Sequence, residues 1–391
     1  MAAPFPGDED AAVAALDVLL GDAVGLRMEA DVPVGALLSG GIDSSLVAAL
    51  MQRASTRPVR TFTIGFREDR FDEARHARQV AAHLGTDHTE LHLTPHRALD
   101  VIPRLPQIYD EPFADASQIP TILVSAIARE HVTVALSGDG GDELFFGYAR
   151  YADALRIWRR IGGWPAGVRH TLATGLGSAG RAVGGHLGFR LRRLSRRIDA
   201  ADFNAYYTNL LSLALTPTAT SGWTEGLPGD PAIPSRLVNP GQRMMFADQA
   251  GYLSDDILTK TDRASMAASL ELRVPLIDHR VVEFAWRLPA LYQWDGYRGK
   301  VLLRQLLYRF VPQELVDRPK QGFEIPLDAW LRGPLREWML DLLAPAALRE
   351  EGLLDTDKVL ALVTEHLTGH GNHGFALWPA LMFEAWQRSY R

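Results

Sequence analysis

The sequence contains no cysteine among its 391 residues. This absence excludes disulfide bonds, thiolate zinc sites and cysteine nucleophiles. The first basic side chain is Arg27, so the positively charged start of a secretory signal is missing, and no apolar run is as long as a membrane span. With 47% hydrophobic and 23% charged residues, the composition is typical of a soluble globular protein with a large core. We therefore expect a cytoplasmic protein without a membrane partner.

Aspartate and glutamate are missing from residues 154–198, which contain ten arginines and nine glycines. The chain as a whole has a net charge of −6, which does not favour a polyanionic partner. One interpretation of the stretch is a solvated insertion balanced by the acidic remainder of the chain. The alternative is a docking strip for an acidic partner or RNA. Few aromatic residues lie between the arginines, so few side chains are available to stack on nucleic-acid bases. We therefore do not expect nucleic-acid binding.

Strand and helix patterns alternate along the first part of the chain. Apolar residues at helical spacing predict a helix over residues 9–29. Short apolar runs that predict strands follow at 34–39, 61–66, 88–94 and 132–137. Helical patterns lie between these runs. Such alternation is typical of an α/β fold, a parallel sheet with helices on both faces.

After about residue 151 the strand patterns fade, and residues 242–289 and 300–391 are expected to be mostly helical. We therefore divide the chain into four regions. These are a linker helix (1–30), an α/β core (31–150), an Arg/Gly-rich helical insertion (151–240) and a C-terminal helical lobe (241–391).

The stretch ALLSGGIDSSLVAAL (36–50) changes from an apolar strand to an apolar helix through a turn rich in glycine and serine. Such a turn presents backbone N–H groups at a helix N-terminus, where phosphate binds best. Gly40 and Gly41 allow a ligand to approach the backbone closely. Further hydroxyl donors are available from Ser39, Ser44 and Ser45. The turn lacks the Gly-Lys-Ser/Thr end of a Walker A loop.

Asp43 places a carboxylate inside this anion-binding turn. A carboxylate beside a pyrophosphate is repelled unless a cation lies between them. Magnesium is commonly held by one or two carboxylates together with substrate phosphates. The turn therefore predicts a site for ATP whose β,γ-pyrophosphate is bound with Mg²⁺. The alternative is a simple turn followed by a helix N-cap.

A second stretch, ALSGDGGDELFFGY (135–148), places three carboxylates within five residues at a strand end: Asp139, Asp142 and Glu143. Their mutual repulsion requires a cation or a raised pKa. In a parallel sheet, ligands bind beyond the carboxyl ends of the strands, so this acidic turn and the SGG turn would meet if their strands are neighbours. The alternative is a solvated Asp-Gly turn. Gly138, Gly140 and Gly141 in the same turn favour a backbone that a ligand can approach closely.

These stretches are parts of a wider resemblance. SGGIDSS resembles the loop of the N-type ATP pyrophosphatases, and the acidic turn narrows the resemblance to the class B asparagine synthetases. Further similar segments follow in the expected order: DVPVGALLSGGIDSS (31–45), TFTIGF (61–66), YDEPFADASQIPTILVS (109–125), KTDRASMAASLELRVPLIDHR (260–280) and RPKQGFEIPLDAWLRGPL (318–335). The resemblance covers about residues 15–390. It implies a doubly wound, five-stranded parallel sheet of the adenine nucleotide alpha hydrolase type, with a helical C-terminal lobe.

The resemblance also implies a reaction. ATP adenylates the aspartate β-carboxylate with release of pyrophosphate, and ammonia then displaces AMP to give asparagine. The residues implied to bind nucleotide are Leu38, Ser39, Gly40, Gly41, Asp43, Ser44, Ser45, Ile64 and Gly138. The residues implied to bind Mg²⁺ are Asp43, Asp142 and Glu143.

Four residues are implied to act in catalysis. Asp139 is the candidate general base for the attacking ammonium. Lys320 is the candidate that neutralises charge on the α-phosphate and the departing pyrophosphate. Glu271 and Arg273 are candidates for organising the substrate pocket, with a structural ion pair as the alternative. Phe146 stands where relatives commonly have glycine, which leaves the local backbone shape open.

Long members of the family begin with a glutaminase domain that carries a catalytic cysteine. Since this sequence contains no cysteine, it cannot hydrolyse glutamine by that route. The sequence is then a fragment, or a separate glutaminase subunit supplies ammonia, or free ammonia or another amine is the nucleophile. Related enzymes close β-lactams or lasso-peptide rings, and amidation of another carboxylate is also open. An RNA-modifying adenylase and a non-catalytic subunit are the more distant alternatives, and a homodimer is possible.

Overall fold

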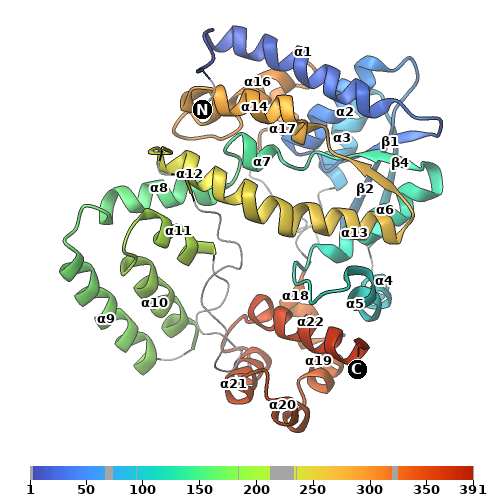
Figure 1. Ribbon diagram of the computed structural model, residues 1–391. Coiled ribbons are helices and arrows are strands. Elements are labelled where there is room, and N and C mark those ends of the chain that lie inside the picture. Colours follow the sequence, from blue (N-terminus) through green and yellow to red (C-terminus); the bar gives the residue numbers. More distant parts are fainter. Residues whose placement is uncertain are drawn as a thin grey trace. The chain divides into compact units, whose positions relative to one another are not determined.

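The computed structural model describes residues 3–66, 74–93, 95–183, 185–211, 233–234, 236–318 and 325–390. The chain forms two compact units (Figure 1). The first, here the sheet unit, comprises Met1–Ile102, Ser117–Ala149 and Met245–Ile325. The second, the helical unit, comprises Pro103–Ala116, Arg150–Met244 and Pro326–Arg391. The segment 245–325, which we had grouped with the C-terminal lobe, is thus part of the same unit as the sheet.

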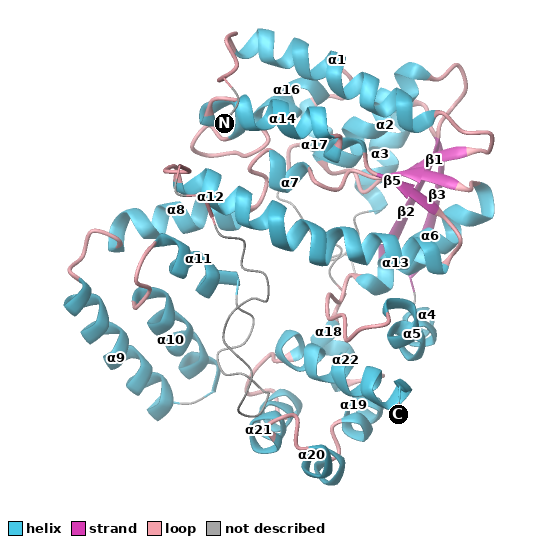
Figure 2. Ribbon diagram, in the orientation of Figure 1, coloured by secondary structure: helices cyan, strands magenta, loops and turns pink. Residues whose placement is uncertain are grey.

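The strands of the sheet unit are drawn in magenta in Figure 2. They form a five-stranded parallel sheet in the order β3-β2-β1-β4-β5. The strands are β1 (Val34–Leu37), β2 (Arg60–Phe66), β3 (Asp87–Leu93), β4 (Val134–Leu136) and β5 (Glu271–Arg273). In the register, Ala36 of β1 lies beside Thr61 of β2 and Leu136 of β4. The predicted α/β class with a five-stranded parallel sheet is confirmed.

Helices cover both faces of this sheet. Helices α2 and α3 pack on one face, where α1 and α16 join them, and α6 packs with α13 on the other (Figure 2). The helices of the sheet unit are α1 (Glu9–Met28), α2 (Ile42–Ala54), α3 (Ala74–Leu84), α4 (Pro95–Val101), α6 (Gln118–His131), α7 (Gly141–Leu144), η3 (Asp248–Leu258), α13 (Thr259–Ala267), η4 (Pro275–Ile277), α14 (His279–Arg287), α15 (Ala290–Gln293), α16 (Val301–Leu307) and α17 (Gln313–Val316).

The core of the sheet unit lies between α1, α2 and α16. Leu16 and Leu20 of α1, Leu46 of α2, and Leu303 of α16 are fully buried there. Burying a leucine side chain stabilises the fold by about 1.5–3 kcal/mol. The segment that we had named a linker helix is therefore part of the core.

The chain changes direction at β1. The crossovers through α2 and α3 lead from β1 to β2 and β3 on one side, whereas β4 pairs with β1 on the other side. The loops that leave the carboxyl ends of β1 and β4 are consequently neighbours. This is the switch point at which open α/β sheets bind their ligands.

The helical pattern expected over residues 242–289 is interrupted by a strand. Helix α13 ends at Ala267, Ser269 has a left-handed φ of 59°, and the chain then enters β5. The amide of Glu271 donates to the carbonyl of Thr133, and the amide of Ser137 donates to the carbonyl of Arg273. Pairing with β4 outweighs the helical pattern of this segment.

The helical unit contains α5 (Leu105–Tyr109), most of α8 (Ala149–Ile161), α9 (Ala166–Val183), α10 (Gly185–Ile198), α11 (Phe203–Leu211), part of α12 (Pro240–Ala247), α18 (Leu327–Arg332), α19 (Arg336–Leu342), α20 (Pro345–Glu351), α21 (Thr356–Leu367) and α22 (Gly374–Tyr390). The arginine-rich stretch forms the end of α8 and the antiparallel pair α9 and α10 (Figure 1). Over the part of the chain that the structure describes, no helix has the length and apolar character needed to span a membrane.

Candidate active site

The loop between β1 and α2 has the backbone features of a phosphate site. Gly41 is the N-cap of α2 and, as a glycine, has no side chain with which to cap the helix. Gly40 has a left-handed φ of 71°, which favours glycine. A methyl group at position 40 would also lie 2.7 Å from the amide nitrogen of Ala77 in α3. Helix α2 therefore begins at a glycine, directly after a loop that lies close to α3.

Serine hydroxyls hold this loop in shape. The Ser39 amide donates to Ser44 Oγ at 3.2 Å, and the Gly41 amide donates to Ser39 Oγ at 3.3 Å. The Ser39 and Ser44 hydroxyls lie 3.0 Å apart. Ser45 is fully buried, and its hydroxyl has no hydrogen-bond partner among the described residues. A buried donor left unsatisfied in this way is compatible with a site that binds a polar ligand.

The acidic turn after β4 packs directly against this loop. A methyl group at position 138 would lie 2.6 Å from the amide nitrogen of Ser44. One at position 141 would lie 2.5 Å from the Asp43 carboxyl group. Gly138 and Gly141 thus allow a closer approach of the two segments than any larger residue would. The two stretches singled out in the sequence form one surface at the carboxyl ends of β1 and β4.

Lys300 connects the two stretches. Its ammonium group forms ion pairs with Asp43 and with Asp142, the latter at 2.7 Å from Oδ1. Only 5% of Lys300 is exposed. Burial disfavours the charged ammonium, but the carboxylates of Asp142 and Asp43 outweigh burial and raise the pKa of Lys300 above its ordinary value. The two acidic side chains therefore converge on one buried positive charge.

The backbone around Lys300 is adapted to this position. Lys300 is the N-cap of α16 with a left-handed φ of 60°, and its amide donates to the carbonyl of Phe145 at 2.8 Å. A methyl group at position 147 would collide with the lysine side chain and the Asp142 carboxylate. Gly147 therefore provides the space through which the lysine reaches the carboxylates.

Glu143 lies in a different environment from Asp142. Its carboxylate accepts a hydrogen bond from the Tyr148 hydroxyl, and its backbone carbonyl accepts one from the Gln249 side chain at 2.8 Å. Burial, followed by the charge of Asp142, raises the pKa of Glu143 to about 7. The Glu143 carboxylate is thus hydrogen-bonded to Tyr148, and its proposed role as a metal ligand stays a prediction.

The remaining candidates for nucleotide binding, and the candidate general base Asp139, lie near the same carboxyl ends of the strands. Asp139 is half-buried and accepts a hydrogen bond from Ser137 Oγ at 2.8 Å. The side chains of Leu38 and Ile64 are each 1% exposed. Since these two side chains are in the core, only their backbones could contact a nucleotide. Ile64 lies on β2, directly next to β1.

Glu271 and Arg273 lie on the edge strand β5. They form an ion pair at 2.6 Å, and Arg273 also donates to the carbonyls of Arg27 and Glu29 at 3.0 and 2.8 Å. The Arg27 carbonyl belongs to the last turn of α1, and the Glu29 carbonyl to the start of the connection that leads to β1. The contacts favour the structural ion pair, the alternative that the sequence had left open.

Lys320 lies outside the described residues. The chain that leads to it reaches the site, because the Arg318 guanidinium donates to the carbonyl of Ser39 at 3.3 Å. The role of Lys320 stays a prediction.

Asp43 and Asp142 are chemically suited to magnesium. Both are carboxylates, the ligand type that Mg²⁺ prefers, and they already share one cation, the ammonium of Lys300. Among the described residues, no three acidic or histidine side chains come together as a complete metal site. Two carboxylates supplemented by substrate phosphates are the usual arrangement for nucleotide-bound Mg²⁺. The residues therefore fit a magnesium ion that is bound together with a polyphosphate.

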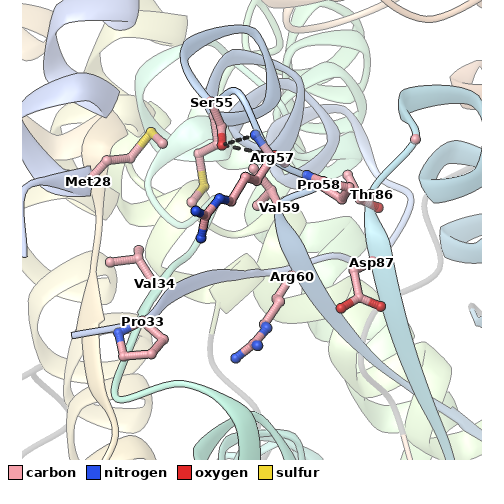
Figure 3. A pocket seen from close by; sticks show the side chains of 12 residues that line it. Met28, Pro33, Val34, Ser55, Arg57, Pro58, Val59, Arg60, Thr86 and Asp87 are labelled. Carbon is pink, nitrogen blue, oxygen red and sulfur yellow. Dashed lines mark hydrogen bonds between the residues drawn. The ribbon is translucent and has the colours of Figure 1, made fainter.

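The pocket drawn in Figure 3 lies at the amino ends of the strands, opposite to the carboxyl ends that carry the candidate site, and has a volume of about 850 Å³. Its lining includes Val34, Arg60 and Asp87, which are the first residues of β1, β2 and β3. Ligands of open parallel sheets bind beyond the carboxyl ends instead. We therefore assign no part of the candidate site to this pocket.

Comparison with known proteins agrees with this geometry. Residues 15–388 match the asparagine synthase family. The chain belongs to that family. It is 35% identical over 395 residues to a protein of Mycobacterium tuberculosis named a putative glutamine-hydrolysing asparagine synthetase, a match that covers 98% of this chain and 59% of the relative. It is 30% identical over 399 residues to asparagine synthetase 1 of Bacillus subtilis, covering 98% of this chain and 60% of the relative.

The chain thus spans about three-fifths of the length of these asparagine synthase relatives. A shorter match, 45% identical over 140 residues, is to a protein of Methanocaldococcus jannaschii named a putative glutamine-hydrolysing asparagine synthetase 2. That match covers 36% of this chain and 27% of the relative.

Sequence reasoning missed Lys300. The lysine lies 257 residues from Asp43, so no local pattern connects the two. The available signal was the Gly-Lys pair at 299–300 directly before an apolar helix. A methyl group at position 299 would overlap the carbonyl oxygen of Phe146, which explains the glycine before the lysine.

Proposed function

We propose that the protein is an ATP-dependent amide-forming ligase of the asparagine synthetase type. It adenylates the β-carboxylate of aspartate with release of pyrophosphate, and ammonia then displaces AMP to give asparagine. The observation that carries this proposal is the convergence of Asp43 and Asp142 on one cationic position beside the SGGIDSS loop. Family membership supports the use of ATP.

In this proposal the SGG loop binds the β,γ-pyrophosphate of ATP. The N–H groups at the start of α2 point toward the carboxyl edge of the sheet, and a helix N-terminus favours negative charge. Ser39, Ser44 and Ser45 would add hydroxyl donors to these N–H groups. The loop is pre-organised by its own hydrogen bonds, so it loses little freedom when a phosphate binds.

Asp43 and Asp142 would hold Mg²⁺ against the pyrophosphate. When bound, this ion neutralises charge on the phosphates as the α–β linkage breaks. Lys300 is then a second positive charge within reach of the same phosphates. Lys320 is proposed to act on the α-phosphate, with Arg318 anchoring the start of its loop on Ser39.

Asp139 is the proposed base of the second half-reaction. It is the first carboxylate of the acidic turn that follows β4, and it is half-buried. From there its carboxylate would take a proton from the nitrogen that attacks the acyl-adenylate. Ser137 donates to Oδ2 of Asp139 and so orients the carboxylate.

The amine donor is proposed to be ammonia, supplied free or by a separate glutaminase domain or subunit. The sequence has no cysteine for glutamine hydrolysis by the family's route. A related enzyme that amidates another carboxylate, or closes a ring with an amine in its substrate, is the second candidate.

Product analysis tests the proposed function. The protein is incubated with Mg-ATP, aspartate and ammonium chloride, and AMP, pyrophosphate and asparagine are measured. We expect the three products in equal amounts. Formation of AMP and pyrophosphate without asparagine would show that aspartate is not the acid that is amidated. Formation of ADP as the nucleotide product would contradict the mechanism.

A further inference from the structure

Lys300 and a divalent cation require the same two carboxylates. The lysine ammonium is ion-paired with Asp43 and lies 2.7 Å from Asp142 Oδ1. Magnesium binds carboxylate oxygens at about 2.0–2.1 Å in a nearly ideal octahedron and does not tolerate a neighbouring ammonium in that shell. Two positive charges so close together also repel each other strongly when they are buried. The two cations therefore cannot both lie between Asp43 and Asp142.

The lysine is fixed at its backbone and can leave only by its side chain. Its amide is bonded to Phe145, and Gly299 is packed against the carbonyl of Phe146. Its side chain passes Gly147, where any larger residue would collide with it. Moving the ammonium away from the carboxylates thus leaves an uncompensated buried charge unless another anion accepts it.

We propose that Lys300 acts as a competing cation that excludes divalent metal from Asp43 and Asp142 until a polyphosphate is bound. The phosphates accept the Lys300 ammonium, and the carboxylates then become available to the metal that accompanies the nucleotide. This inference rests on the proposed function, because it assumes that the SGG loop receives a polyphosphate. It predicts that metal alone binds poorly and that nucleotide and metal bind cooperatively.

The first test measures metal binding without nucleotide. The free Mn²⁺ concentration is followed by electron paramagnetic resonance during titration of the whole chain, with Lys300→Met compared with wild type. We expect Lys300→Met to bind Mn²⁺ at least tenfold more tightly. The matched control is Lys358→Met, an exposed lysine on α21 that pairs with Asp355, and it should bind Mn²⁺ as weakly as wild type. Equal affinity in all three proteins would overturn the proposal.

The second test separates competition from a merely structural role. Thermal unfolding is measured in chelator and in Mg²⁺. We expect Lys300→Met to lose stability in chelator, because two carboxylates then repel each other, and to recover it in Mg²⁺. Lost stability that Mg²⁺ does not restore would show a structural ion pair and refute the proposal. If Lys300→Met does not fold, Lys300→Gln takes its place, because the amide still donates hydrogen bonds to a carboxylate.

A third measurement needs no variant. Mg²⁺ and α,β-methylene-ATP, which resists cleavage at the α–β linkage, are added to the wild type singly and together. We expect the melting temperature to rise for the pair by more than the sum of the two single effects, and additive shifts would contradict the proposal. None of these three measurements uses aspartate or ammonia. Failure of the asparagine assay would therefore leave the metal competition standing, and failure of the metal competition would leave the proposed reaction standing.

Discussion

At the residue scale, the site depends on how charge is balanced in a confined space. Asp43 and Asp142 are nearly buried, and each would be costly alone. Lys300 is ion-paired with both carboxylates, and the glycines at 138, 141 and 147 allow the three side chains to come together. The same two carboxylates are the proposed ligands of the magnesium ion that accompanies ATP.

Replacing either of these two carboxylates tests their role. Asp43→Asn and Asp142→Asn keep the shape of the side chain but remove its charge. We expect pyrophosphate release from Mg-ATP and aspartate to fall on the order of 100-fold or more, because charge stabilisation at the reacting phosphates is lost. Asp262→Asn, an exposed residue paired with Arg263, is the matched control. Wild-type rates in either site variant, with circular dichroism unchanged, would remove that residue from the site.

Phe146 shows how a departure from the usual family pattern is accommodated. It has a left-handed φ of 58°, a conformation that favours glycine, the residue that the family resemblance implies here. Its ring is buried and stacks on Trp294 with centroids 5.2 Å apart. The packing of the ring thus offsets the backbone strain.

We expect Phe146→Gly to lower the free energy of unfolding by roughly 1–4 kcal/mol, since the lost ring outweighs the relieved strain. Phe146→Ala loses the ring but keeps the strain, so it should be less stable than Phe146→Gly. Urea unfolding of the three proteins measures both differences. A Phe146→Gly protein as stable as wild type would show that the ring contributes nothing.

At the element scale, the helical unit contains a close helix pair. A methyl group at position 180 of α9 would lie 2.8 Å from the carbonyl oxygen of Gly188 in α10. In contrast, a methyl group at position 175 of α9 would meet nothing within 4 Å. Two glycines of the Arg/Gly-rich insertion, at positions 180 and 188, thus lie at a close helix–helix contact, and the arginine-rich stretch forms helices.

These glycines give a matched pair of substitutions. Gly188→Ala should destabilise the protein by roughly 1–3 kcal/mol, because the helices must move apart. Gly175→Ala should stabilise it by about 0.5–1 kcal/mol, because alanine favours an exposed helix. Denaturant unfolding compares the two. Equal effects of the two substitutions would contradict the close packing of α9 and α10.

Helix α21 contains a second testable feature, the fully buried His366. Its Nδ1 accepts a hydrogen bond from the His373 amide at 3.1 Å. Burial, followed by the charge of Arg332, outweighs the attraction of Asp328 and lowers the pKa of His366 below its ordinary value of 6.5. Protonation would break the bond to His373.

The lowered pKa of His366 predicts the sign of a pH effect. The unfolded chain takes up this proton near pH 6.5, whereas the folded chain resists it. Stability should therefore fall as the pH decreases below about 6.5. His366→Gln should lose this part of the pH dependence, and His370→Gln, an exposed neighbour, should keep it. Chemical unfolding between pH 5 and pH 8 provides the comparison, and identical slopes in both variants would refute the assignment.

At the scale of the whole molecule, local patterns predicted the architecture and the meeting of the two signature stretches. Alternating strands and helices are a local property, and parallel strands bring their carboxyl ends to one edge. The interactions that were missed depend on distant partners. Strand β5 is only three residues long and exists because it pairs with β4. Lys300 is set beside Asp43 by tertiary packing, and the Glu271–Arg273 pair faces the α1–β1 connection for the same reason.

In the proposed site, Asp43 and Asp142 share a metal ion that holds the phosphates of ATP at the SGG loop. The most direct measurement is the anomalous-scattering map of crystals grown with Mn²⁺ and α,β-methylene-ATP. We predict a manganese peak between the two carboxylates, bonded to the β- and γ-phosphates, with the Lys300 ammonium moved to the phosphates. A peak elsewhere, or a nucleotide bound away from residues 39–45, would contradict the account.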